Sequence, residues 1–179
     1  MLNFHKYVDQ PGNYCCNDGT CFTSELVCDG ISHCQSGEDE VNCTMINIPE
    51  YYDKMDPPEE AVANITIMDI MDVDEDDSSY VVYFRLSVKW YDRKLDFHYL
   101  KNKDYANIIP EEYTKQIWIP ELDFSFVQHS YDLQQIKHIY VQKTKIKRVK
   151  SDLIFPSETY DGASNPLIYV SEHRIKFFL

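Results

Sequence analysis

The chain has 179 residues, 30 of them acidic and 17 basic, which gives a formal net charge of -13. This charge repels nucleic acid and anionic membrane surfaces, so the composition argues against both as binding partners. Hydrophobic residues make up 44% of the chain and aromatic residues 14%, which is enough for a packed core and excludes a disordered polymer. Fourteen tyrosines and nine phenylalanines against five glycines favour a mainly β protein.

All six cysteines lie near the N-terminus, between Cys15 and Cys43. About thirty residues are too few for a hydrophobic core, and disulfides replace that core in small secreted domains. The clustering predicts two units in an oxidising, extracellular compartment: a module at residues 12–44 and a larger domain at residues 61–179, joined by a linker at residues 45–60. Six cysteines allow 15 pairings, and their spacing alone does not choose among these.

Three strings in the module combine cysteine with turn-forming and acidic residues: Cys16-Asn17-Asp18-Gly19-Thr20-Cys21, Cys28-Asp29-Gly30 and Gly37-Glu38-Asp39-Glu40. In this order and spacing they resemble the low-density-lipoprotein receptor class A module. The resemblance implies the disulfides Cys15 to Cys21, Cys16 to Cys34 and Cys28 to Cys43. Cys15 departs from the family pattern, in which the first cysteine stands several residues before the second.

The same resemblance implies a calcium ion, which takes six to eight oxygen ligands. Carried over by position, the ligands are the side chains of Asp29, Asp39 and Glu40 and the backbone carbonyls of Leu26 and Ile31. His33 stands where the family has a fourth carboxylate, and imidazole is a poor calcium ligand, so we expect weakened affinity or a water in that place. The alternative is an acidic surface without metal. Acidic modules of this family dock lysines, which implies a possible basic protein partner.

The linker contains Pro49, Pro57 and Pro58, and a two-residue alternation begins after it. A period of two predicts half-buried strands, which form a hairpin around the acidic run 72–79, expected to be an exposed loop. The alternating sets are Val62, Asn64, Thr66 against Ala63, Ile65, Ile67, and Val82, Phe84, Leu86, Val88 against Tyr83, Arg85, Ser87, Lys89.

Fewer elements are predicted in the second half of the chain. One helical turn is expected near Pro110-Glu111-Glu112, because proline is tolerated at a helix start. Further strands are expected at residues 137–149 and 167–178, with Asp161-Gly162 and Asn165-Pro166 supplying the turn before the last strand.

Three motifs in this larger domain occur in order along the chain: Ile70-Met71-Asp72-Val73-Asp74-Glu75, Trp90-Tyr91-Asp92-Arg93-Lys94-Leu95 and Ile117-Trp118-Ile119-Pro120-Glu121-Leu122-Asp123-Phe124. Together they resemble the ligand-binding domain of Cys-loop, or pentameric neurotransmitter-gated, ion-channel subunits. The resemblance implies a partial immunoglobulin-like β-sandwich that assembles with homologous subunits into a pentamer. It also implies a small-molecule neurotransmitter bound between subunits.

Structural roles explain several of these residues without a ligand. Trp90 and Trp118 are expected to be core anchors, and Asp92 to fix a turn through backbone amides. The resemblance places Arg85 and Ser87 on the complementary side of the ligand pocket, and Asp123 and Ser125 on its first principal loop. An arginine there would favour a carboxylate-bearing ligand, because guanidinium pairs with carboxylate through two hydrogen bonds. A solvated strand face is the alternative for each of these positions.

Two further patterns bear on the surface. Asn64-Ile65-Thr66 is a glycosylation sequon, so Asn64 is expected to carry sugar on an exported domain if it is exposed. The basic run Lys143, Lys145, Lys147, Arg148 and Lys150 is expected to be a solvated edge, with contact to an acidic neighbouring subunit as the alternative.

The sequence is expected to be the front part of a longer product. Residues 1–7 contain no apolar run of signal-peptide length, and no stretch approaches the roughly 18 apolar residues of a membrane helix. No cysteine follows Cys43, although the family has a cysteine pair thirteen residues apart. The product would therefore stand on the extracellular face of the plasma membrane and touch the bilayer only through segments beyond this sequence.

Three classes of function follow from these observations. The leading prediction is the extracellular part of a ligand-gated ion-channel subunit. The alternative is a secreted or cell-surface calcium-dependent binding or adhesion protein. An enzyme is not predicted, because the six histidines show no metal-ligand spacing and Ser125, Ser130 and Ser171 lack the context of an activated nucleophile.

Overall fold

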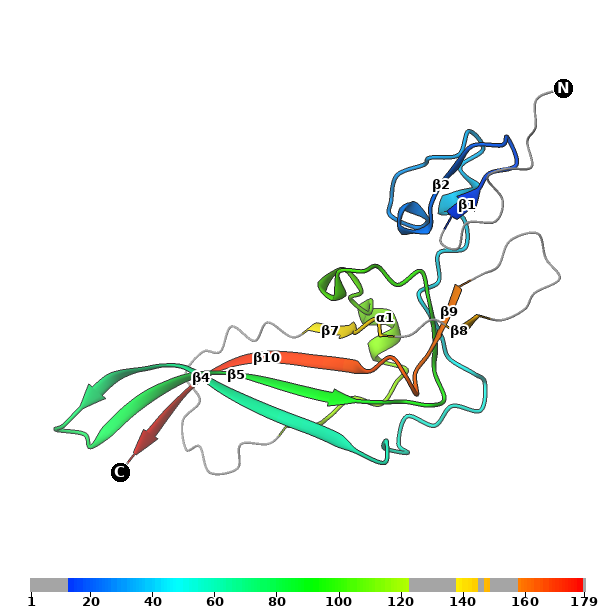
Figure 1. Ribbon diagram of the computed structural model, residues 1–179. Coiled ribbons are helices and arrows are strands. Elements are labelled where there is room, and N and C mark those ends of the chain that lie inside the picture. Colours follow the sequence, from blue (N-terminus) through cyan, green and yellow to red (C-terminus); the bar gives the residue numbers. More distant parts are fainter. Residues whose placement is uncertain (1–12, 123–137, 145–146, 149–157, 179) are drawn as a thin grey trace, which may run out of the picture.

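The computed structural model describes residues 13–122, 138–144, 147–148 and 158–178, and strands dominate these ranges (Figure 1). The strands are β1 (Asn13–Cys15), β2 (Cys21–Thr23), β3 (Ile46–Asn47), β4 (Ala61–Asp74), β5 (Ser79–Trp90), β6 (Asp96–His98), β7 (His138–Val141), β8 (Lys147–Arg148), β9 (Glu158–Asp161) and β10 (Leu167–Phe178). The helical turns are η2 (Ser24–Leu26), η3 (Glu38–Glu40), η4 (Asp104–Ala106) and α1 (Glu111–Thr114), the last of which confirms the predicted helical turn after Pro110.

The N-terminal module, here residues 13–44, is a small unit held together by disulfides. Its β1–β2 hairpin is antiparallel, and three bridges join Cys15 to Cys21, Cys16 to Cys34 and Cys28 to Cys43. These are the pairs that the family order implies, and Cys15 takes part despite its position directly before Cys16. Few apolar side chains are buried in the module, so cross-links and not a hydrophobic core hold it together.

The body, here the described residues from 45 onward, contains two four-stranded sheets. The first has the order β4-β5-β10-β7 and the second β3-β6-β9-β8. The core draws on both: Phe84 and Leu86 come from the first sheet, while Ile46, Phe97 and Tyr160 come from the second and are at most 1% exposed. The predicted mainly β fold, a partial sandwich behind a disulfide-rich module, is confirmed.

Strand β5 shows why the two-residue pattern predicts this architecture. Phe84, Leu86, Val88 and Trp90 are buried, while Arg85 between them is exposed. Strand β10 pairs with β5 in an antiparallel register that runs from Leu167 and Trp90 to Phe178 and Ser79 without a break. The alternation in each strand therefore builds one apolar face and one polar face on the same sheet.

Strand β4 corrects the prediction of a half-buried hairpin. Ile65 and Ile67 lie opposite Leu86 and Phe84, on the apolar face as predicted, yet they are 66% and 62% exposed. The strand is at the edge of its sheet, and no described element covers that part of the face. The predicted loop is also too long, because β4 continues to Asp74 and β5 begins at Ser79.

The range 137–149, where further strands are expected, contains strands of two different sheets. The segment contains β7, which pairs with β10 in the first sheet, and β8, which pairs with β9 in the second. Gln142 and Lys143 lie between them outside any strand. Alternation of charged and apolar residues continues through both strands, so it carries no signal that the chain crosses from one sheet to the other.

The stretch predicted as a linker makes specific contacts with the body. Strand β3 pairs with β6, and the Tyr52 hydroxyl donates to Asp92 Oδ2 at 2.6 Å and accepts from the Trp118 backbone N–H at 3.0 Å. Asp92 Oδ1 also accepts from the Lys94 amide at 3.1 Å, which confirms its predicted role in the turn after β5. The boundary at residue 60 stays a prediction.

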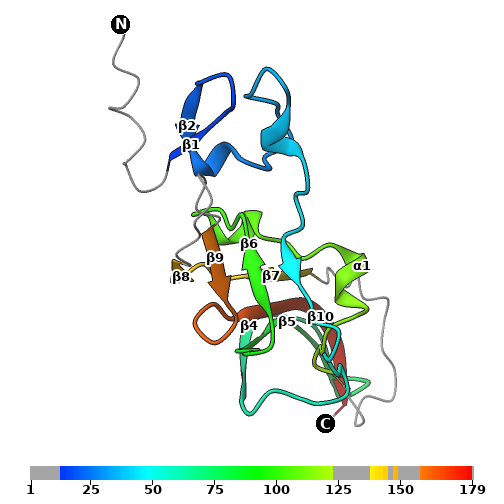
Figure 2. The ribbon, with the colours of Figure 1, turned by 90° about the vertical axis from the view of Figure 1, so that its right-hand side faces the viewer.

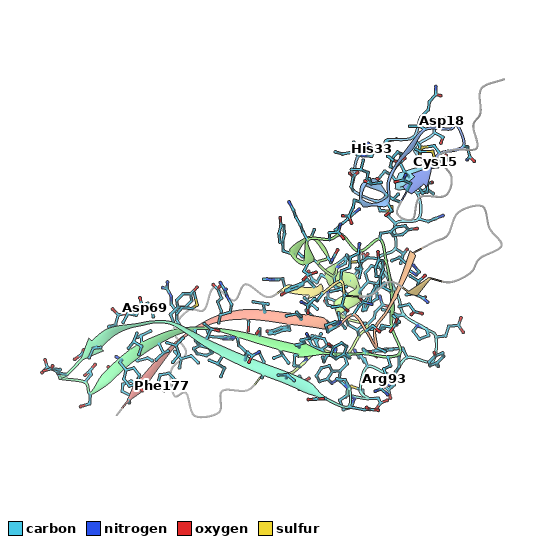
Figure 3. All side chains as sticks on the ribbon, viewed as in Figure 1. Cys15, Asp18, His33, Asp69, Arg93 and Phe177 are labelled. Atoms are coloured by element: carbon cyan, nitrogen blue, oxygen red, sulfur yellow. A yellow bond between two sulfur atoms is a disulfide. The ribbon has the colours of Figure 1, made fainter. Side chains whose placement is uncertain are left out.

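The module and the tip of the β4–β5 hairpin lie at opposite ends of the molecule (Figure 1), and Figure 2 shows β6 and β9 between the module and strands β4 and β5. Figure 3 shows the same separation in side chains, with Cys15, Asp18 and His33 on the module and Asp69 and Phe177 toward the other end. Within the described ranges, no helix combines the length and the apolar character that crossing a bilayer requires.

Candidate functional site

A hollow of about 560 Å³ lies on the polar face of the first sheet. Strands β5, β10 and β7 supply its floor, and the η4 turn supplies one wall. It is lined by Arg85, Ser87, Asp104, Tyr105, His138, Tyr140, Val170 and Glu172. Ser87, Val170 and His138 lie in one row across the three strands, because Val170 pairs with both of the others.

An ion pair occupies one side of the hollow. Arg85 and Glu172 are opposite each other in the β5–β10 ladder, and the guanidinium donates to Glu172 Oε1 from Nε at 3.0 Å and from its terminal nitrogen at 2.7 Å. The Tyr83 hydroxyl donates to Glu172 Oε2 at 2.5 Å. The hydrogen bonds from Tyr83 and then Arg85 lower the pKa of Glu172, and Glu172 in turn raises the pKa of Arg85.

The other side of the hollow combines a carboxylate with aromatic rings. Asp104 and Tyr105 come from η4, and Tyr140 comes from β7. Burial and the nearby Asp104 carboxylate raise the pKa of Tyr140, so its phenol stays neutral. Tyr105 is 70% exposed, which leaves its ring accessible to a small molecule.

The hollow contains two of the four predicted ligand-contacting residues. Arg85 and Ser87 line it, whereas Asp123 and Ser125 fall outside the described residues. Sequence reasoning missed Glu172, Asp104 and the tyrosines. Glu172 could have been found only through the β5–β10 register, which places it beside Arg85 although the two are 87 residues apart.

Asn64 of the predicted sequon lies one strand away from this hollow. It is exposed on β4 and is paired with Ser87 of β5, so its side chain shares the polar face of the sheet. The neighbouring rung pairs Thr66 with Arg85. A sugar on Asn64 would therefore stand on the same face as the hollow, beside it.

The second candidate site is the acidic loop of the module. Glu40 accepts from the amides of Asp29 and Gly30, at 3.0 Å each, and Asp39 accepts from the amides of His33 and Cys34 at 2.6 and 3.2 Å. Asp29 accepts from the Ile31 amide at 2.9 Å, and its other oxygen is 3.2 Å from His33 Nε2. The three predicted carboxylates therefore surround one loop, residues 29–34.

These contacts favour the ionised forms of Asp29 and Asp39. Burial acts against the charged form of Asp39, but the hydrogen bonds from the amides of His33 and Cys34 outweigh it and lower the pKa. Asp29 shows the same balance, with the Ile31 amide lowering its pKa against burial. Each carboxylate oxygen has a lone pair beyond its amide bond, so an oxygen-preferring cation fits this donor set.

A different cluster, made of Cys16, Cys34 and Glu38, has the mutual distances of a metal site among the described residues. Its two sulfurs are joined in a disulfide, so they are not thiolate ligands. Glu38 instead accepts from the backbone and side-chain nitrogens of Asn17. The cluster has a structural role, because it links residues 16–17 to residues 34–38 of the module.

A comparison with models of protein families matches residues 40–150 to the neurotransmitter-gated ion-channel ligand-binding domain. This match covers more than half of the chain. The chain belongs to this family. A second match, at residues 10–43, is to the low-density lipoprotein receptor domain class A, so the N-terminal module is a class A module. Both resemblances indicated by the sequence motifs are confirmed.

The family has a known general role. Neurotransmitter-gated channel ligand-binding domains are extracellular and bind ligands, and they are not a family of enzymes. The sequence also predicts a basic protein partner for the class A module, and the family matches give no support for one. Among the residues that the structure describes, Lys101 and Lys143 of the same chain donate hydrogen bonds to the module.

Proposed function

We propose that this ligand-binding domain receives a small-molecule neurotransmitter in the hollow over β5, β10 and β7. The observation that carries the proposal is that Arg85 and Ser87, chosen from sequence, line one hollow on the polar face of β5, a strand whose other face contributes to the core. In an assembled receptor, homologous subunits in a pentamer would complete the site, and ligand binding would gate ion flow.

The charges of the lining favour a ligand with an ammonium group. Asp104 and Glu172 bring two carboxylates against the single guanidinium of Arg85. Glu172 already pairs with that guanidinium, so a ligand carboxylate would have to displace it. The rings of Tyr105 and Tyr140 offer faces over which a cation is stabilised by about 0.5–2 kcal/mol.

Two probes of matched shape test this proposal on the chain itself. Tyramine and 4-hydroxyphenylacetate share a phenol and differ in carrying an ammonium or a carboxylate. We expect tyramine to shift the amide resonances of Ser87, Tyr105 and Tyr140, and Asp104→Asn to weaken that effect. Asp76→Asn, in the distant hairpin turn, serves as the control of equal charge change.

Two outcomes of the titration would reject parts of this proposal. Shifts with 4-hydroxyphenylacetate alone would reject the ammonium preference and favour the carboxylate ligand that Arg85 suggests by itself. Shifts with neither probe up to about 10 mM, which corresponds to less than about 3 kcal/mol of binding, would reject this hollow as the site for either class.

We also propose that the class A module binds calcium through Asp29, Asp39 and Glu40, together with the carbonyls of Leu26 and Ile31. The support is the position of the three carboxylates around loop 29–34, together with the lowered pKa values of Asp29 and Asp39. His33 supplies an imidazole near Asp29, so we expect weak affinity. Amide spectra of the module that stay unchanged when EGTA removes calcium would reject this site.

Asn64 is proposed to carry an N-linked glycan, because it is exposed on the polar face of β4. The test is a mass decrease on treatment of the secreted chain with peptide-N-glycosidase F. Loss of that decrease in Thr66→Ala, which breaks the sequon, would assign the sugar to Asn64.

A further inference from the structure

The class A module is fastened to the ligand-binding domain by the side chain of Lys101. The ammonium of Lys101 donates to the backbone carbonyls of Glu25 and Val27, at 2.8 and 2.6 Å. These carbonyls flank Leu26 in η2. The carboxylates of Asp29, Glu25 and Glu40 stabilise its charge against the effect of burial, which lowers the pKa of Lys101.

Glu25 adds two contacts from the side of the module. Its Oε1 is 3.3 Å from Lys143 Nζ, and its Oε2 accepts from the Asn102 amide at 3.2 Å. Lys143 is only 14% exposed and also donates to the carbonyl of Leu100 at 2.8 Å. The contact therefore involves partly buried, charge-assisted hydrogen bonds, which contribute more than exposed ion pairs do.

Most of these contacts involve one loop, residues 99–107, which follows β6, and Lys143 is joined to that loop through the Leu100 carbonyl. The loop begins at Tyr99 with a φ of 56°, a left-handed conformation that a tyrosine holds only when its surroundings fix it. It ends at Asn107, which is fully buried; its side-chain Oδ1 accepts from the Lys101 amide and its Nδ2 donates to the Lys101 carbonyl. Hydrogen bonds between Lys101 and Asn107 therefore close loop 99–107, and the module contacts this loop at Lys101.

The same loop forms a wall of the hollow. Asp104 and Tyr105 line it, and Asp104 Oδ1 accepts from the backbone amide of Lys143, at 3.0 Å. Lys143 therefore touches the module with its ammonium and the wall of the hollow with its amide. The module and the hollow lie on two sides of one short segment.

We propose that the class A module docks onto its own ligand-binding domain through Lys101 and Lys143 and thereby holds Asp104 and Tyr105 in place at the hollow. The basic partner that fits the acidic module is loop 99–107 of the same chain, together with Lys143. The docking needs no ligand, so it stands or falls independently of the proposed function.

Hydrogen exchange of the whole chain, followed by mass spectrometry, tests the docking. Lys101→Met removes the ammonium and keeps the length of the side chain. Lys103→Met is the matched control, because Lys103 belongs to the same loop and is exposed. We expect Lys101→Met to speed exchange about ten-fold in segments 24–28 and 102–107, as loss of charge-assisted hydrogen bonds implies, and Lys103→Met to leave both segments unchanged.

A charge swap provides a second test that a folding defect cannot imitate. Glu25→Lys and Lys143→Glu each place like charges together, so each should speed exchange in the same segments. The double variant restores opposite charges and should recover at least half of the lost protection.

Three results would overturn the proposal. One is protection in Lys101→Met equal to that of the unaltered chain. Another is faster exchange in segment 24–28 without any change in segment 102–107, which would separate the module from the wall of the hollow. The third is a double variant no better protected than its two parents.

Discussion

Replacing Tyr52 by phenylalanine removes one oxygen and keeps the ring in place. That oxygen joins three parts of the body, because it donates to Asp92 and accepts from the Trp118 amide, while its own residue belongs to the segment between module and β4. Burial, followed by the hydrogen bond to Asp92, raises the pKa of Tyr52, so the phenol is a fixed donor at neutral pH.

The expected cost follows from the two lost hydrogen bonds. A hydrogen bond to a charged group contributes about 1.5–3 kcal/mol, and a neutral one about 0.5–1.5 kcal/mol. Asp92 is 7% exposed and keeps its bond from Lys94, so part of its requirement stays satisfied. We therefore expect Tyr52→Phe to lower the free energy of unfolding by about 2–3 kcal/mol.

Urea unfolding at pH 7 measures this loss, with Tyr51→Phe as the matched control. Tyr51 is the preceding residue and is 80% exposed, so its change should stay within about 0.5 kcal/mol. Equal midpoints for the two variants would refute the reasoning, because the segment before β4 would then contribute nothing through Tyr52.

Two further predictions concern a close backbone contact and a pH-dependent pair. Gly162→Ala would place a Cβ atom 1.9 Å from the carbonyl oxygen of Asp92, so we expect a loss of about 3 kcal/mol and a melting temperature lower by several degrees; an unchanged melting temperature would contradict the contact. The hydrogen bonds from Tyr83 and Arg85 lower the pKa of Glu172 below its ordinary value of 4.5, so they stabilise the fold above that value and are lost as pH falls through the lower folded-state pKa. The stability difference between the unaltered chain and Glu172→Gln should therefore shrink below about pH 4 in urea titrations, and a constant difference from pH 7 to 3 would show that the pair does not contribute.

The sequence predicts the parts of the fold that depend on residues close to one another in the chain. The alternation from Val82 to Val88 follows from the two faces of a strand, and strand β10 occupies residues 167–178 as expected. The motifs that indicate the two families, and the acidic residues of the module, are likewise local patterns. A period of two or a cysteine spacing needs no knowledge of what lies opposite.

The remaining features depend on contacts between distant segments. Lys143 belongs to a basic run that reads as a solvated edge, yet its ammonium is nearly buried against Glu25, 118 residues away. Glu172 becomes part of the candidate site only when β10 lies beside β5. The exposure of Ile65 has the same origin, because alternation reports which face a side chain occupies and not whether anything covers it.

The pairing of β5 with β10 also determines when the first sheet can form during synthesis. Its rungs join residues 77 to 99 positions apart in the chain, from Trp90 with Leu167 to Ser79 with Phe178. Contacts of such high sequence separation form slowly, and a ribosome adds only about 5–20 residues per second. The β4–β5 hairpin, closed by a short turn, therefore waits several seconds during synthesis with the apolar side of β5 uncovered. This nascent chain is thus expected to bind a chaperone until β10 emerges from the ribosome.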